Sequence, residues 1–320
     1  MSNRAIFVAR ESGVTRFFAK HVYDPRSCLL MGQDGLGTFM RVGPGDELAR
    51  LDDVWGDAGV LMDADARRLL YFGGECAWEI GAREVLNAFL AAEVWPGWDV
   101  RFCPRCLADF ARALDLEPEA SRPAADGSHL LAWDALRPSV DSAVPGEVGS
   151  LVLIRRDGAS FVHTLDTMFA TDLLDYGERL VDELSTPGFD RWTSGIDGDG
   201  ICSALVVDCD RRRLTCWYVD ADDLPGSFAR FWPNWEIVDL ADDRRALTRA
   251  TGGAVAFDES VDLDRALASI RAFALDGEEG PQMPEGRFES LLASFLVDWR
   301  SPSPPEGRRT SPQSPTRREA

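Results

Sequence analysis

The sequence predicts an α+β protein built from two degenerate copies of one unit, followed by C-terminal helices and a disordered tail. Two observations predict this class. Pairs of short apolar strands recur in the same order in both halves of the chain, and each set precedes a helical pattern. With 320 residues, 45% of them apolar, and ten Trp and seventeen Phe, the chain can bury the cores of two such units.

The internal similarity lies in three pairs of segments. Residues 6–13 match residues 151–158 at an offset of 145, and residues 59–69 match residues 204–214 at the same offset. The Trp-Pro-x-Trp segment of residues 95–100 matches residues 232–237 at an offset of 137, which requires a deletion of eight residues in the second copy. We interpret this series as an ancient duplication.

Each copy is expected to follow the order ββ, ββ, α, β, α, with antiparallel hairpins. The first hairpins turn at Gly13 and Gly158, and the second turn at Asp-x-Asp segments. Apolar residues from Ile80 to Leu90 have helical spacing within residues 79–94, and a shorter counterpart falls at 222–231. The later elements expected are strands 99–102 and 236–240 and helices 105–115 and 242–250.

The domain boundaries follow from composition. We expect a first repeat at residues 1–118, a linker at 119–147, a second repeat at 148–252, C-terminal helices at 253–299 and a disordered tail at 300–320. An additional helix is expected at 171–184. Helices at 261–275 and 286–299 should cover an exposed sheet face.

The net charge of −20 restricts the partners. Such a surface repels phosphate backbones and anionic lipids, which argues against nucleic acid and membrane partners. It suits a basic protein instead. No apolar run approaches the roughly 18 residues of a membrane span, the residues after Met1 do not form an apolar signal region, and the number of cysteines, seven, is odd. These features favour a cytoplasmic location.

The sharpest chemical candidates are four carboxylates, each at the end of an apolar strand or in the turn after it. Asp63 and Asp65 follow Val60-Leu61-Met62, and Asp208 and Asp210 occupy the matching positions of the second copy. Paired carboxylates can bind Mg²⁺ or Mn²⁺, so these residues are candidate metal ligands. Apart from this metal no cofactor is expected.

The pattern resembles the Asp-x-Asp motif of metal-dependent glycosyltransferases and the motif of haloacid-dehalogenase-type phosphatases. The resemblance covers only the strand end and the turn, and it implies a divalent-metal-dependent transferase or hydrolase. In those families the strand leads into a loop or helix, whereas here the chain returns directly as the strand 69–72. This difference favours the alternative that the Asp side chains bind backbone groups of their own turns.

Cys103 and Cys106 form the only Cys-x-x-Cys pair, at a strand end and a helix start. A helix start lowers a thiol pKa, so a redox-active or thiol-regulated pair is one hypothesis, beside purely structural thiols. Zinc would need two further ligands, and the three histidines have no ligand spacing. With so few histidines and no Gly-x-Ser-x-Gly segment, a Ser-His-Asp arrangement is not supported.

The function expected from these observations is that of an acidic cytoplasmic binding protein, such as an inhibitor, an immunity-type protein or a regulatory factor. The alternatives are a divalent-metal-dependent hydrolase or transferase and a thiol-regulated protein. The Trp-Pro-x-Trp segments are expected to pack a helix on the sheet in preference to forming an exposed binding platform.

Overall fold

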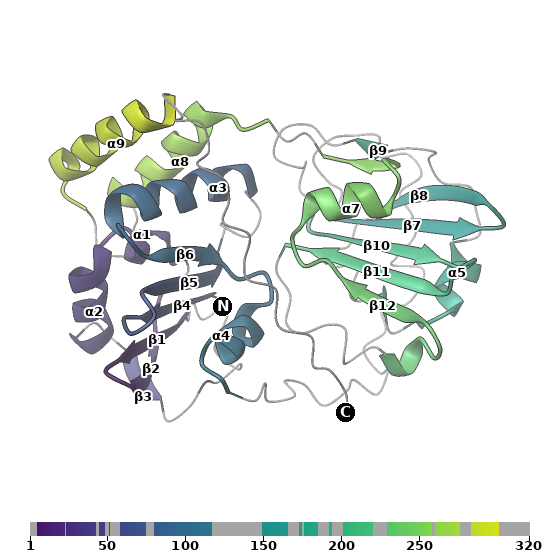
Figure 1. Cartoon of the computed structure of the whole chain (residues 1–320), viewed down its shortest axis with the longest axis horizontal. Helices are drawn as coiled ribbons and strands as arrows, with labels where there is room; N and C mark the ends of the chain where they lie inside the picture. Colours follow the sequence, from purple (N-terminus) through teal and green to yellow (C-terminus); the bar gives the residue numbers. More distant parts are fainter. Residues whose placement is uncertain are drawn as a thin grey trace, which may run out of the picture.

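The computed structural model describes residues 5–22, 24–42, 45–48, 51, 58–74, 80–116, 149–165, 173–174, 176–184, 192–193, 201–219, 229–257, 260–275 and 283–300 (Figure 1). The predicted linker at 119–147 lies outside the described residues, as does the predicted tail apart from Arg300. Within the described ranges, no helix combines the length and apolar character needed to cross a membrane.

The first unit is a six-stranded mixed sheet in the order β3-β2-β1-β4-β5-β6. Its strands are β1 (Ala5–Glu11), β2 (Val14–Lys20), β3 (Gly45–Leu48), β4 (Ala58–Asp63), β5 (Arg68–Gly73) and β6 (Asp99–Phe102). The hairpins β1–β2 and β4–β5 are antiparallel, while β1–β4 and β5–β6 are parallel. The helices are α1 (Arg26–Leu29), α2 (Gly32–Val42), α3 (Ile80–Phe89), which continues as a π-helical turn (Leu90–Val94), and α4 (Cys106–Ala113).

The second unit is a five-stranded mixed sheet in the order β12-β11-β10-β7-β8. Its strands are β7 (Ser150–Arg156), β8 (Ala159–Leu165), β10 (Ser203–Asp208), β11 (Arg213–Tyr218) and β12 (Glu236–Asp239). Helices α5 (Arg179–Glu183) and α7 (Arg244–Ala250) and a 3₁₀ turn (Ala229–Phe231) belong to this unit, and β9 (Trp192–Thr193) pairs with β13 (Val255–Ala256). Helices α8 (Leu263–Leu275) and α9 (Glu285–Arg300) follow.

The two sheets share strand order, direction and register. The parallel partners Ala5 and Ala58 lie 53 positions apart, as do Ser150 and Ser203. The next parallel pairs join Arg68 to Asp99 and Arg213 to Glu236, which are separations of 31 and 23 positions. The difference of 31 − 23 = 8 equals the deletion that the sequence alignment requires. The two sheets are therefore equivalent in geometry. Their origin by duplication stays a prediction.

Both faces of each sheet are buried. In the first sheet, alternate residues of β4 contribute to opposite clusters: Val60 and Met62 join the helices α1 to α3, and Leu61 joins α4. In the second sheet, Leu205 faces α5, while Val206 belongs to a cluster with α7. The strict alternation follows from the two-residue period of a strand, and helices on both faces account for the nearly continuous apolar sequence of the central strands.

Helices α8 and α9 return from the end of the second unit to the first. Ile270 of α8 and Phe288 and Phe295 of α9 lie in the same core cluster as Phe89 of α3. Figure 1 shows both helices on the outer side of α3. The expectation that they cover a bare sheet face is thus wrong, because α3 and the π-helical turn already occupy that face and α8 and α9 pack mainly on them.

The tryptophans of the Trp-Pro-x-Trp segments anchor equivalent joints. Trp95 is 1% exposed and donates its indole N–H to the Leu29 carbonyl at 2.7 Å. Trp232 is equally buried and donates to the Leu174 carbonyl at 2.8 Å. Each indole packs edge-to-face on the second tryptophan of its segment, with ring centroids 4.9 Å apart in both units. Trp95 therefore ties the end of α1 to the core, and Trp232 ties the short helical turn at Leu174 to it, as expected for packing tryptophans.

The α+β class, the four antiparallel hairpins and the helices around 79–94, 105–115, 242–250, 261–275 and 286–299 are confirmed. The helix expected at 171–184 is shorter, since only α5 (179–183) is an α-helix among the described residues there. Helices α1 and α2 and strand β3 were not expected. They lie in a Gly-rich stretch, where glycine lowers helix and strand propensity and hides the pattern.

The indole hydrogen bonds give a prediction about stability. Trp95→Phe and Trp232→Phe should each lower the free energy of unfolding by about 1–3 kcal/mol, because a buried carbonyl loses its donor. Urea denaturation measures the change. Trp98→Phe, which alters the half-buried tryptophan of the same segment, is the matched control and should cost less. Equal losses for Trp95→Phe and Trp98→Phe would contradict the anchoring role.

Candidate functional site

Asp63 and Asp208 end the central strands β4 and β10 and brace the turns that follow. The Asp63 carboxylate accepts the Ala66 N–H at 3.0 Å and lies 4.0 Å from the Arg10 guanidinium. Asp208 accepts the Arg211 N–H at 3.0 Å and lies 3.7 Å from the Arg155 guanidinium. The arginines lie on the neighbouring parallel strands, in register with the aspartates. Each buried carboxylate is therefore bonded and accompanied by a cation.

Asp65 and Asp210 tie the second hairpin of each unit to the first. The two carboxylate oxygens of Asp65 accept the backbone N–H groups of Ser12 at 2.7 Å and Gly13 at 2.8 Å. Asp210 makes the same pair of bonds to Asp157 and Gly158, at 2.9 and 3.1 Å. The turns that these bonds clamp have left-handed backbone angles. Such turns expose amides that need acceptors.

This arrangement bears on the metal hypothesis. The four carboxylates point to backbone amides or to arginine, and each pair lies beside cations that disfavour a further positive charge. Within the part of the chain that the structure describes, no group of three or more His, Cys, Asp or Glu side chains is placed to hold a metal ion. Binding of Mg²⁺ or Mn²⁺ at Asp63, Asp65, Asp208 or Asp210 stays a prediction.

Asp65 offers a direct test. Asp65→Ala should lower the free energy of unfolding by about 1–3 kcal/mol, because two turn amides lose their acceptor. Asp65→Asn removes the same charge but keeps one acceptor oxygen, so it should cost clearly less. Thermal melting with and without MnCl₂ measures both effects. A manganese-dependent rise in melting temperature that both variants abolish would contradict the turn role and support the metal hypothesis.

Cys103 follows β6 and Cys106 begins α4, so both lie where the sequence places them. Both thiols are buried, in the apolar cluster that contains Phe72 and Phe110. Burial in this cluster raises the pKa of the Cys103 thiol well above its usual value, and nearby Asp109 raises it further. The sequence predicted the opposite direction from the helix start. Desolvation of the thiolate outweighs the dipole of a short helix.

The redox hypothesis for Cys103 and Cys106 is untested by this geometry and stays a prediction. A buried protonated thiol is a weak nucleophile, because the thiolate is the reactive form. In this conformation the arrangement favours the packing role that the sequence left as the alternative.

The cysteines give a prediction on pH. Burial raises the pKa of Cys28, Cys202 and Cys216 to about 12, from a usual value of 9.0. Because these folded-state pKa values exceed the unfolded one, their contribution to stability is complete below pH 9 and is lost as the pH rises toward 12. Urea denaturation between pH 7 and 11 should show a steady decline. Cys216→Ala should be less stable at pH 7 but show a shallower decline, and an unchanged slope would contradict this account.

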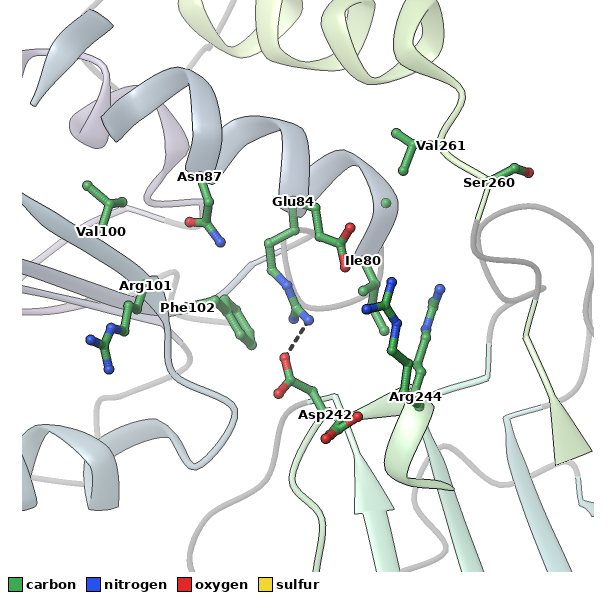
Figure 2. A pocket seen from close by; sticks show the side chains of 14 residues that line it. Ile80, Glu84, Asn87, Val100, Arg101, Phe102, Asp242, Arg244, Ser260 and Val261 are labelled. Carbon is green, nitrogen blue, oxygen red and sulfur yellow. Dashed lines mark hydrogen bonds and ion pairs between the residues drawn. The ribbon is translucent and has the colours of Figure 1, made fainter. Parts of the chain in front are cut away.

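A cavity lies between the two units (Figure 2). It has a volume of about 590 Å³ and is bordered by α3, β6, the start of α7 and the segment before α8. Its lining contains four arginines, Arg83, Arg101, Arg244 and Arg245. The lining carboxylates are Glu84, Asp242 and Asp243. The volume falls within the range of small-molecule binding sites.

Two ion pairs join the units, and the first of them lines this cavity. Arg83 of α3 donates to the Asp242 carboxylate at 2.6 Å, drawn as the dashed line in Figure 2, and Arg105 donates to Asp239 at 2.7 Å. Asp239 is held in place by the Tyr218 hydroxyl at 2.9 Å. Ile80 of α3 adds an apolar contact, since it belongs to the core cluster of the second sheet. The cavity is therefore walled by groups that also hold the units together.

Comparison with known proteins gave no match among family models, curated proteins or solved structures. The function of the cavity must therefore be argued from its own geometry.

Sequence reasoning did not single out the cavity residues. One signal was present: Arg83 lies three residues after Ile80 and three before Leu86, on the buried face of the helix predicted at 79–94. A charged residue at an apolar position indicates a buried pair or a ligand contact. The partner Asp242 lies 159 residues away, beyond the reach of any local pattern.

Proposed function

We propose that this protein is a binding protein of the inhibitor, immunity or regulatory kind, which associates with a basic protein partner. The observation that carries the proposal is the net charge of −20 on a folded scaffold. An excess of carboxylates of this size attracts cationic surfaces and accelerates association with them.

The placement of the arginines supports the proposal. Arg83, Arg101, Arg244 and Arg245 line the cavity between the units, and Arg10 and Arg155 accompany strand-end carboxylates. Exposed carboxylates stand on the outer elements: Asp46 and Glu47 on the edge strand β3, and Asp182, 82% exposed, on α5. Arg83 is 4% exposed, and Arg10 and Arg155 already accompany carboxylates, so these three cations add little to the outer surface.

The proposal includes a cytoplasmic location. The thiols of cysteines 28, 103, 209 and 216 are free, which suits a reducing compartment. The candidate catalytic groups also fit a non-enzymatic role, since the aspartates brace turns and the cysteines are buried.

A partner of this kind can be recognised by its stoichiometry and its response to salt. Protein isolated from its producing cells at low ionic strength should carry a basic protein in a fixed ratio, as measured by native mass spectrometry. With purified components, the dissociation constant should weaken about tenfold or more between 50 and 300 mM NaCl, because the attraction is screened. Recovery of the protein without a stoichiometric partner would contradict the proposal.

Two charge-neutralised variants locate the surface that binds the basic partner. Asp46→Asn with Glu47→Gln alters the edge of the first sheet, and Asp182→Asn alters α5 of the second unit. The variant on the docking face should slow association severalfold, while the other serves as its folded control.

A further inference from the structure

The cavity between the units has a lining whose charge is opposite to that of the chain. Its lining holds four guanidinium groups and three carboxylates, but Arg101 is 68% exposed and pairs with Asp99 at 2.6 Å. Asp243 is already engaged, because it caps α7 by accepting the Ala246 N–H at 2.7 Å and lies 3.8 Å from the Arg249 guanidinium. Without Arg101 and the engaged Asp243, three guanidinium groups against two carboxylates leave a formal charge of 3 − 2 = +1, in a protein of charge −20. The local field at this opening therefore favours an anion.

Arg83 supplies the second, independent observation. Its side chain is 4% exposed, and its plane lies on the Phe102 ring, with the guanidinium carbon 3.9 Å from the ring centroid. One terminal nitrogen, Nη2, donates to Asp242, but the other, Nη1, is buried and has no hydrogen-bond partner among the described residues. A buried N–H group without an acceptor is costly, so a cavity beside it is suited to an acceptor brought by a ligand.

The backbone adds to this preference. Ile80 and Gly81, in the first turn of α3, line the same cavity as Arg83. The first-turn N–H groups of a helix lack acceptors within the helix, and the helix dipole places partial positive charge there. A tetrahedral oxyanion can accept from such amides and from a guanidinium at the same time.

We propose that the cavity between the two units is a binding site for a small molecule carrying a phosphoryl group, with Arg83 as its buried anchor and Arg244 and Arg245 as its outer cationic wall. Arg244 is held in place by stacking on the Phe257 ring, with the guanidinium carbon 4.9 Å from the ring centroid. The cavity of about 590 Å³ exceeds the size of phosphate alone, and Val100 and Val261 give it apolar walls. The ligand is thus a phosphorylated metabolite with an apolar or planar portion.

Asp242 would compete with a bound phosphoryl group for the Arg83 guanidinium. In the structure it pairs with Arg83 across the cavity wall, and it is 30% exposed. A bound phosphoryl group would share the guanidinium with this carboxylate, and the two negative charges would repel each other. Binding is therefore weaker than Arg83, Arg244 and Arg245 alone would allow, and neutralising Asp242 should strengthen it.

Titration calorimetry on the full chain tests the site with inorganic phosphate, AMP, adenosine and succinate as probes. Phosphate should bind in the millimolar range, and AMP about tenfold more tightly, since its base and ribose bury against the apolar walls. Adenosine, which lacks the phosphoryl group, and succinate, which offers carboxylates, should bind at least tenfold more weakly than AMP.

Variants at the rim of the cavity distinguish binding at this site from non-specific electrostatic attraction of AMP. Arg245→Ala should weaken AMP binding about tenfold. Arg16→Ala, which removes an exposed arginine of β2 outside the lining, should leave it within about twofold. Asp242→Asn should tighten it severalfold, an effect that a purely structural role for the ion pair does not produce. Arg83→Met should abolish it, and if that variant does not fold, Arg245→Ala and Asp242→Asn decide the matter.

Three results would overturn the assignment. They are absence of saturable binding of both phosphate and AMP, equal binding of adenosine or succinate and AMP, and equal responses to Arg245→Ala and Arg16→Ala. Weaker binding to Asp242→Asn than to the parent protein would also count against it. None of these outcomes depends on the presence of a protein partner.

Discussion

The central strands of the two sheets, β1, β4, β7 and β10, are buried along most of their length, and the need to cover both of their faces organises the rest of the molecule. A sheet buried on two sides requires a layer of helices on each. The first unit draws one layer from α1, α2 and α3 and the other from α4. Asp65 and Asp210 support this arrangement, because their hydrogen bonds hold together the turns of the two hairpins that contain these strands.

The seam between the units has a different character. Among the described residues, two ion pairs and an apolar contact through Ile80 link the units. Arginines suit such a seam, since their planar groups stack on rings and form directed bonds to carboxylates. The same properties make the seam a recognition surface for an oxyanion, so the groups that position the units also line the cavity.

The sequence was sufficient to predict the features of the fold that depend on local residue patterns. The hairpins follow from alternation and turn residues, and Trp95 and Trp232 were placed in the core because aromatic residues beside a strand pack there. It was insufficient for features set by long-range contact. The parallel pairing of β1 with β4 has no local signal, and the pairing of Arg83 with Asp242 depends on how the units meet. The predicted direction of the shift in the Cys103 pKa was wrong, because desolvation depends on neighbours distant in sequence.

The return of α8 and α9 to the first unit sets an order for folding during synthesis. Phe288 and Phe295 pack on Phe89, so the apolar layer of the first unit is incomplete until nearly 300 residues have been made. Over that interval α3 presents an uncovered apolar surface to the cell, while the second unit already possesses the elements of its own core. The portion translated first is therefore the last to become fully enclosed.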